Sequence, residues 1–262
     1  MITSSQASRR LAMMLAGVVL TVLLGLEVYT RTADDFAIRP VGLPADTQVA
    51  VLIFHGSQDG DDPLLESIRN RFVELLGAGN GVAVVNYNWS PVSDHRLRAT
   101  ANGARLGESL GRELAGLSDL RELRLVAHSA GAAIPDALCA AYRQAGTGRA
   151  RVEMTFLDPF GISGFVDWNY GARNHGRCAD YAVVYINTDD PAPATNTWLQ
   201  QAYNIDVTAA EGRDRFTRNG HYWPLQYFLN VMDRDVRRTS DASHTENPRG
   251  SGRSAQGAQP RS

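Results

Sequence analysis

Residues 121–133 read Arg-Glu-Leu-Arg-Leu-Val-Ala-His-Ser-Ala-Gly-Ala-Ala, and this stretch decides the fold. A short apolar run stops at Ser129, small residues surround it, and a helix-like segment follows at once. A nucleophile elbow has this form, because its serine lies on a sharp strand-to-helix turn with strained backbone angles and an exposed hydroxyl. Ala127 and Gly131 suit such a turn, since larger side chains would collide with neighbouring backbone. A plain strand–turn–helix is the alternative interpretation.

Strand patterns recur on both sides of this stretch, separated by segments with helical spacing of apolar residues. This alternation predicts βαβ units in a mostly parallel sheet with helices on both faces. Function in such a sheet belongs at the carboxyl ends of the strands, where His55, Ser129 and Asp158 all fall. Further strands are expected at residues 49–54, 82–85, 152–157, 181–186 and 203–207, and a closing helix at 224–236.

Residues 11–26 form an unbroken apolar or small run that follows Arg9 and Arg10. A positive flank before an apolar run is an export or membrane-insertion signal. Because no convincing small-x-small cleavage site follows, we expect residues 1–30 to be an uncleaved N-terminal signal-anchor, with a cleaved signal peptide as the alternative. The protein would then be membrane-anchored with an extracytoplasmic domain, or secreted.

The rest of the chain divides into three parts. We expect a linker at residues 31–47, a single domain at 48–236 and a disordered tail at 237–262, which holds almost no apolar residues. The formal net charge of -2 over 262 residues gives no reason to expect a nucleic-acid partner. Cys139 and Cys178 match no metal-ligand spacing, so the sequence leaves a buried thiol and, in an exported domain, a disulfide as alternatives.

A serine hydroxyl is a weak nucleophile at neutral pH, so it needs a base within hydrogen-bond reach and a third group that orients the base. The chain order for this kind of elbow is serine, acid, histidine. Three histidines follow Ser129: His175 in a long loop, His221 after the last expected strand, and His244 in the tail. The position of His221 between strand and closing helix favours it as the base.

Three carboxylates compete for the role of the acid. Asp158 ends the strand after the elbow's helix, whereas Asp189 and Asp190 follow the next strand. Pro159 is a common turn residue, so Asp158 is also readable as a simple loop carboxylate. Many hydrolases of this architecture place the acid two strands after the elbow strand, which points instead to Asp189 or Asp190.

The chain resembles the α/β-hydrolase superfamily over roughly residues 48–235, and within it the pancreatic-type lipases. The matching motifs are Phe54-His55-Gly56-Ser57, the elbow, Phe156-Leu157-Asp158-Pro159, the strand end at 184–189 and the tyrosine-rich segment 221–228. The resemblance implies an α/β-hydrolase fold and a serine hydrolase that cleaves a carboxylic ester through an acyl-enzyme. It implies a triad of Ser129, Asp158 and His221, and so favours Asp158 over Asp189 and Asp190.

The remaining expectations concern the surroundings of the triad. The backbone N–H groups of Ser57 and Ala130 should form the oxyanion hole. His55 should hold its loop, and His128 should pack beside the nucleophile or contact substrate.

The chain also departs from the family. Ala127 replaces the first glycine of the elbow, and the lid insertions and accessory domain of such lipases are short or missing. We expect a small-molecule or lipid ester as substrate, no cofactor, no metal, and membrane contact through the N-terminal apolar segment. The alternatives are a non-catalytic, membrane-tethered binding module on the same fold, or an acyltransferase or thioesterase.

Overall fold

The computed structural model of the chain describes residues 4–77, 79–146, 149–190, 192, 194–241 and 245–255. Among these residues a seven-stranded sheet occupies the centre, and its strands follow the order β2-β1-β3-β4-β5-β6-β7. All neighbouring strands pair in parallel, which confirms the expected parallel sheet. The strands are β1 Val49–Phe54, β2 Val82–Tyr87, β3 Glu122–His128, β4 Arg151–Leu157, β5 Tyr181–Ile186, β6 Tyr203–Asp206 and β7 Gly252–Ser254.

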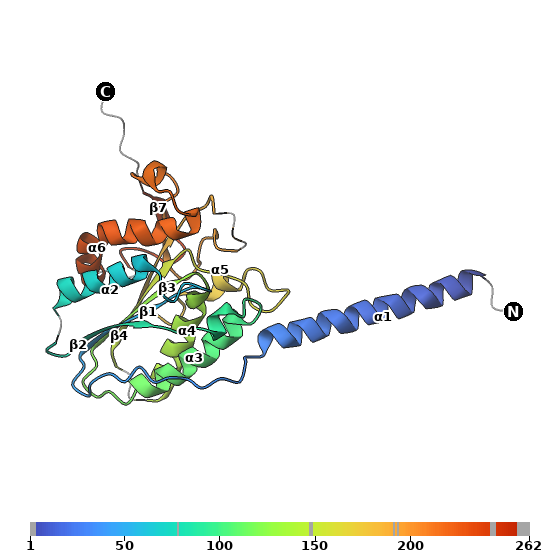
Figure 1. Ribbon diagram of the computed structural model, residues 1–262, viewed down its shortest axis with the longest axis horizontal. Coiled ribbons are helices and arrows are strands. Elements are labelled where there is room, and N and C mark those ends of the chain that lie inside the picture. Colours follow the sequence, from blue (N-terminus) through green and yellow to red (C-terminus); the bar gives the residue numbers. More distant parts are fainter. Residues whose placement is uncertain are drawn as a thin grey trace, which may run out of the picture.

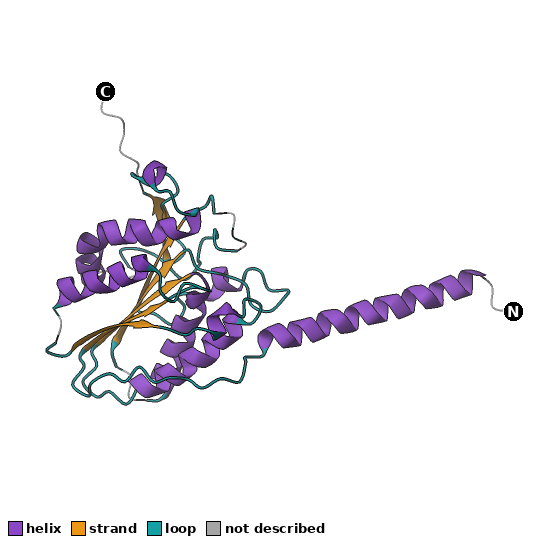
Figure 2. Cartoon of the chain, in the orientation of Figure 1, coloured by secondary structure: helices purple, strands orange, loops and turns teal. Residues whose placement is uncertain are grey.

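Helices cover both faces of this sheet (Figure 2). One apolar cluster joins α3 and α4 to one face, and a second cluster joins α2 and α6 to the other. Alternate residues of β1 enter the two clusters, so the strand is buried on both sides and reads as a continuous apolar run. The helices are α1 Ser4–Arg31, α2 Pro63–Leu76, α3 Ala99–Leu114, α4 Ala133–Gln144, α5 Tyr170–Asn174 and α6 Trp223–Asp241.

Close packing of α3 on α4 fixes the helix that follows the elbow. A Cβ added at Gly107 would lie 2.5 Å from the carbonyl oxygen of Ile134, and one at Gly111 would lie 2.2 Å from that of Leu138. Real Cβ atoms do not approach backbone so closely, and therefore only glycine allows this contact. The sequence Gly103-Ala-Arg-Leu-Gly107-Glu-Ser-Leu-Gly111 thus sets how near the two helices lie.

α1 projects away from the domain as a single long helix (Figure 1). Its stretch Arg9–Arg31 is long and apolar enough to cross a membrane, judged by length and composition alone. The apolar side chains of residues 11–24 are exposed rather than packed on the domain. α1 is therefore not a core helix of the described domain.

The C-terminal segment differs from the expected disordered tail. α6 continues to Asp241, and β7 pairs in parallel with β6 at the edge of the sheet. The Arg249 guanidinium donates to the carbonyl oxygens of Gly176 and Ala179. Main-chain pairing, the Arg249 contacts and the burial of Ala255 hold this segment, so its polar composition did not indicate its structure. Residues 242–244, which include His244, and 256–262 lie outside the described residues.

A disulfide joins Cys139 of α4 to Cys178, just before β5, with 6.0 Å between their Cα atoms. Cys139 lies on the buried side of α4, in the apolar cluster between α4 and the sheet, and Cys178 packs against this cluster. Of the two readings that the sequence left open, the structure therefore has the disulfide.

Candidate active site

Ser129 lies on a strained turn at the carboxyl end of β3. Its φ is 51°, in the left-handed region that non-glycine residues seldom adopt, and a short 3₁₀ turn leads from it into α4. A Cβ added at Gly131 would lie 2.7 Å from the carbonyl oxygen of Phe54, so glycine lets this turn pack against the end of β1. These are the features of a nucleophile elbow on a parallel sheet. The chain has the α/β-hydrolase fold.

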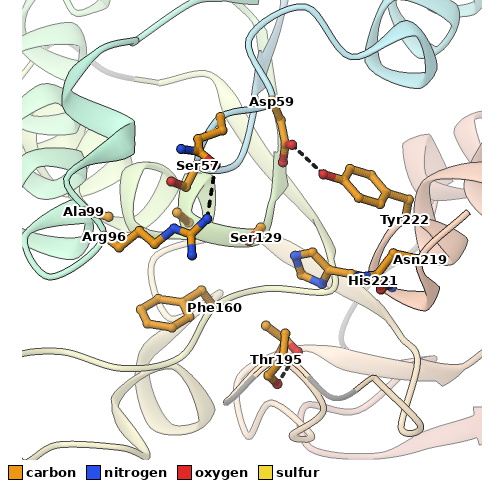
Figure 3. A pocket seen from close by; sticks show the side chains of 13 residues that line it. Ser57, Asp59, Arg96, Ala99, Ser129, Phe160, Thr195, Asn219, His221 and Tyr222 are labelled. Atoms are coloured by element: carbon orange, nitrogen blue, oxygen red, sulfur yellow. Dashed lines mark hydrogen bonds between the residues drawn. The ribbon is translucent and has the colours of Figure 1, made fainter.

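A cavity of about 540 Å³ opens beside this elbow. In this α/β-hydrolase fold the cavity lies at the carboxyl ends of the strands, where the sequence predicted the functional residues. Figure 3 shows its side chains, with the His221 imidazole extending from the loop before α6. The predicted nucleophile, base and oxyanion residues all line it. The lining residues are Ser57, Gln58, Asp59, Arg96, Ala99, Ser129, Ala130, Phe160, Ala192, Thr195, Asn219, His221 and Tyr222.

His221 contacts two carboxylates through one ring nitrogen. Its Nδ1 lies 2.9 Å from Asp158 Oδ2 and 2.7 Å from Asp190 Oδ2. Both carboxylates are buried, with side-chain exposures of 0% and 1%, whereas Asp189 is exposed. The sequence favoured Asp158 over Asp190 as the acid. The geometry does not distinguish the two, because both carboxylates contact the imidazole.

Hydrogen bonds from other residues fix the positions of both carboxylates. Asp158 Oδ1 accepts a hydrogen bond from the backbone N–H of Asn187 at 2.9 Å. Asp190 accepts from the Thr195 hydroxyl at 2.7 Å and from the backbone N–H of Ala192 at 3.0 Å. The polar, proline-containing stretch around Asp190 is thus anchored at this carboxylate.

Burial and hydrogen bonds set the charges of this cluster. Burial raises the pKa of Asp158 to about 7, against the hydrogen bond from His221. Burial also opposes ionisation of Asp190, but hydrogen bonds from His221 and its other donors outweigh it and hold the pKa of that carboxyl well below its usual range. Burial would lower the pKa of His221, yet its bonds to both carboxylates raise that pKa to about 9. Asp190 is therefore the carboxylate that stays ionised at neutral pH.

The Ser129 hydroxyl makes no hydrogen bond to a described residue. Ser129 and His221 line the same cavity without a hydrogen bond between them, and catalytic contacts are often loose before substrate binds. The hydroxyl oxygen of Ser57, across the cavity, is buried without a partner. A Cβ added at Gly56 would lie 2.8 Å from Ser129 Cβ, so this loop closely approaches the elbow.

His128 packs against the ring of His221. Its ring centre lies 4.7 Å from that of His221, and its side chain is fully buried. Burial lowers the pKa of His128, which keeps the ring neutral. Asp59 Oδ2 lies 3.2 Å from His128 Nδ1, and Asp59 Oδ1 accepts the Tyr222 hydroxyl at 2.6 Å. The sequence did not single out Asp59 or Tyr222, although the Tyr222 position beside His221 was a usable signal.

The other histidines have structural surroundings. His55 Nδ1 donates to the carbonyl oxygen of Gly56 at 2.6 Å, and its Nε2 accepts the backbone N–H of Trp89 at 3.0 Å. This is the loop-holding role expected of His55. His175 is buried, with Nε2 3.0 Å from the carbonyl oxygen of Phe160, and does not line the cavity.

Asp158, Asp190 and His221 also form a group whose ligand atoms lie within 4.8 Å of one another, close enough to hold a metal ion. The same three side chains already bond to each other through His221 Nδ1. A carboxylate that accepts the imidazole Nδ1–H orients a catalytic base, and here two carboxylates are placed to do so.

No protein-family model and no curated protein matches the chain. Among solved structures it is similar to esterase 2 of Thermogutta terrifontis phosphoramylated by tabun. That chain is 16% identical, with 80% of this chain and 92% of that one covered and a TM-score of 0.41. The propionate-bound form of this thermophilic esterase is 16% identical, with 77% and 88% covered and a TM-score of 0.39. The similarity is distant, and the fold assignment rests on the sheet and the elbow.

Proposed function

We propose that this protein is a serine hydrolase that cleaves a carboxylic ester, in the manner of lipases and esterases. The observation that carries the proposal is the cavity itself. It is lined by a serine on a strained elbow and by a histidine whose Nδ1 meets two buried carboxylates. The substrate is a small-molecule or lipid ester, and the chemistry uses side chains and backbone without a cofactor.

In this mechanism the Ser129 hydroxyl attacks the ester carbonyl carbon while His221 Nε2 takes its proton. The carbonyl oxygen becomes an oxyanion, which the backbone N–H groups of Ser57 and Ala130 stabilise. The imidazolium then gives its proton to the leaving alcohol, and an acyl-enzyme remains on Ser129. Water repeats the sequence with the same base, releases the acid and restores the serine.

Asp158 and Asp190 both act on His221. Asp158 stands in the Leu-Asp-Pro segment after β4, as in pancreatic-type lipases, and Asp190 follows the next strand, as in many other hydrolases of this architecture. Asp190, ionised at neutral pH, stabilises the imidazolium that forms when Ser129 loses its proton. Asp158 and Asp190 both orient the ring, because each can accept the same Nδ1–H.

We infer the location of the enzyme from its N-terminal helix. Arg9–Arg31 is long and apolar enough to span a bilayer, and the two arginines before the apolar run favour the cytoplasmic side for the N-terminus. The Cys139–Cys178 disulfide suits an oxidising, extracytoplasmic compartment. The catalytic domain therefore works outside the cytoplasm on a retained anchor.

A fluorophosphonate probe tests the proposal, because it reacts with a serine that a neighbouring base activates. The wild-type protein should be labelled on Ser129, and Ser129→Ala should not be labelled. Ser118→Ala is the matched control, since Ser118 is exposed and does not line the cavity. An unlabelled wild-type protein would favour the non-catalytic binding module. If the probe labels Ser129 but the unlabelled protein transfers the acyl group of an ester to an acceptor other than water, the protein is an acyltransferase.

A further inference from the structure

The loop of residues 162–168, between β4 and α5, is bonded directly to the end of α1. The Glu27 carboxylate accepts hydrogen bonds from the backbone N–H of Phe165 at 2.7 Å and of Val166 at 3.2 Å. The same carboxylate also accepts from the Arg31 guanidinium. The loop and the helix therefore keep a fixed relation to each other.

Two further contacts make this junction specific. Gly164 has a φ of +69°, and a Cβ added there would lie 2.5 Å from Glu27 Oε1 and 2.8 Å from Arg31 Nε. The Thr100 hydroxyl donates to the carbonyl oxygen of Ile162 at 2.6 Å, which ties the start of the loop to α3. The loop is thus fitted between α1 and the domain rather than free.

The same junction includes the segment before α3. The Arg98 guanidinium lies over the Tyr29 ring, 4.0 Å from its centre, and its Nε donates to the Tyr29 carbonyl oxygen at 3.0 Å. Leu97 comes directly before this arginine, and Arg96 and Ala99 on either side line the catalytic cavity. Figure 1 shows α1 leaving the domain beside α3.

Large apolar side chains gather at this junction without being buried. Leu97 is 62% exposed, Phe165 40%, Val166 65% and Trp168 55%. Single exposed apolar residues are ordinary, but three of these four occupy one short loop beside the end of α1. We call these four side chains the junction patch.

The length of α1 sets the depth of this patch. The unbroken apolar run ends at Leu26, and Glu27 is the next residue. At a rise of about 1.5 Å per residue, a group bonded to Glu27 lies within about one helical turn of the end of that run. The run is shorter than the ~20 residues that span a hydrocarbon core comfortably, so both of its ends lie near the core boundary. The headgroup region adds only about 5–8 Å on each side, and tryptophan is enriched there.

We propose that the junction patch inserts into the headgroup layer of the same bilayer that α1 spans. This inference rests on α1 being a retained membrane anchor, and it does not depend on ester hydrolysis. The bilayer is the occupant because the loop is bonded to the residue that follows the apolar run. The domain is then held against the membrane surface by two contacts, α1 and the patch, rather than tethered at one point.

Tryptophan fluorescence of the full-length protein in phosphatidylcholine vesicles tests this. Of the four tryptophans, Trp89 and Trp223 are buried, while Trp168 and Trp198 are exposed. Lipids brominated near the headgroup end of the acyl chain should quench wild-type fluorescence more strongly than lipids brominated near the chain terminus. Trp168→Phe should lose most of this bromine-dependent quenching, and Trp198→Phe, the matched control, should keep it.

Equal quenching in the wild type and in Trp168→Phe would overturn the proposal, as would an absence of bromine-dependent quenching. The second result is also expected if another copy of the protein or a partner covers the patch. Failure of the full-length protein to stay with the vesicles after alkaline washing would overturn both the anchor and the patch. A protein that hydrolyses no ester but shows Trp168-dependent quenching would refute the proposed function and support the patch.

Discussion

His221 with two carboxylates on one nitrogen is the feature that most shapes the chemistry. Because either carboxylate can accept the Nδ1–H, the loss of one leaves the ring oriented by the other. We expect Asp158→Asn and Asp190→Asn each to lower kcat on the order of 10- to 100-fold, and the double variant on the order of 10⁴-fold. Asp189→Asn is the matched control, since that side chain is exposed, and it should leave kcat unchanged.

Steady-state kinetics of the three single variants and the double variant measure this coupling. A single variant that alone loses as much activity as the double variant would show that one carboxylate does the work and the other is structural.

The pH dependence of hydrolysis follows from the same contacts. His221 must be neutral to accept the Ser129 proton, and its pKa is raised to about 9, so kcat/KM should increase with pH and level off above that value. Asp190→Asn removes the negative charge of one of the two carboxylates that raise this pKa, so the midpoint of the rise should move to lower pH. Profiles of kcat/KM for the wild type, Asp190→Asn and Asp189→Asn measure the shift. A midpoint that stays in place or moves upward in Asp190→Asn would contradict the assigned electrostatics.

At this scale the sequence predicted where Ser129, Asp158 and His221 lie but not how the carboxylates share the imidazole. The elbow, the Leu-Asp-Pro segment and the histidine before α6 each leave a local pattern. No local pattern records that two neighbouring strand ends aim their carboxylates at one nitrogen. The bond from Thr195 that fixes Asp190 joins two residues of a stretch whose composition favours mobility.

At the scale of helices and strands, the disulfide between α4 and the segment before β5 should contribute to the free energy of unfolding. It closes a sequence separation of 39 residues, and the loss of such a cross-link typically costs about 2–4 kcal/mol of unfolding free energy. Cys178→Ser should lower Tm, and reductant should lower the Tm of the wild type but not that of Cys178→Ser. Thermal denaturation with and without reductant measures both effects. Equal Tm values in all four samples would mean that the disulfide does not stabilise the fold.

Strands buried on both faces were predictable, whereas the short edge strand β7 was not. β1 and β5 appear in the sequence as apolar runs because helices cover both of their faces. β7 reads Gly-Arg-Ser and carries no apolar side chain, so nothing in its composition favours a strand. Backbone pairing with β6 and the Arg249 contacts hold it in place, and these depend on the folded domain.

For the molecule as a whole, the N-terminal helix carries the prediction of location. With Arg9 and Arg10 before the apolar run, we expect the N-terminus on the cytoplasmic side and the catalytic domain outside. Cell fractionation should recover the full-length protein with membranes, and protease added to the outside of the membrane should digest the domain. Replacement of both arginines by glutamate should impair this orientation, whereas Arg39→Glu, after α1, should not. A soluble cytoplasmic protein with its N-terminus intact would contradict the anchor.

Ser129 is the proposed nucleophile of an ester hydrolase, and the turnover of Ser129→Ala tests this role most directly. The Ser129 hydroxyl makes no hydrogen bond to a described residue, so its removal should leave the far-ultraviolet circular dichroism and Tm unchanged. Hydrolysis of a short-chain p-nitrophenyl ester should fall on the order of 10⁴-fold or more, because triad members act as a unit. Turnover close to that of the wild type in a folded Ser129→Ala protein would show that Ser129 is not the nucleophile.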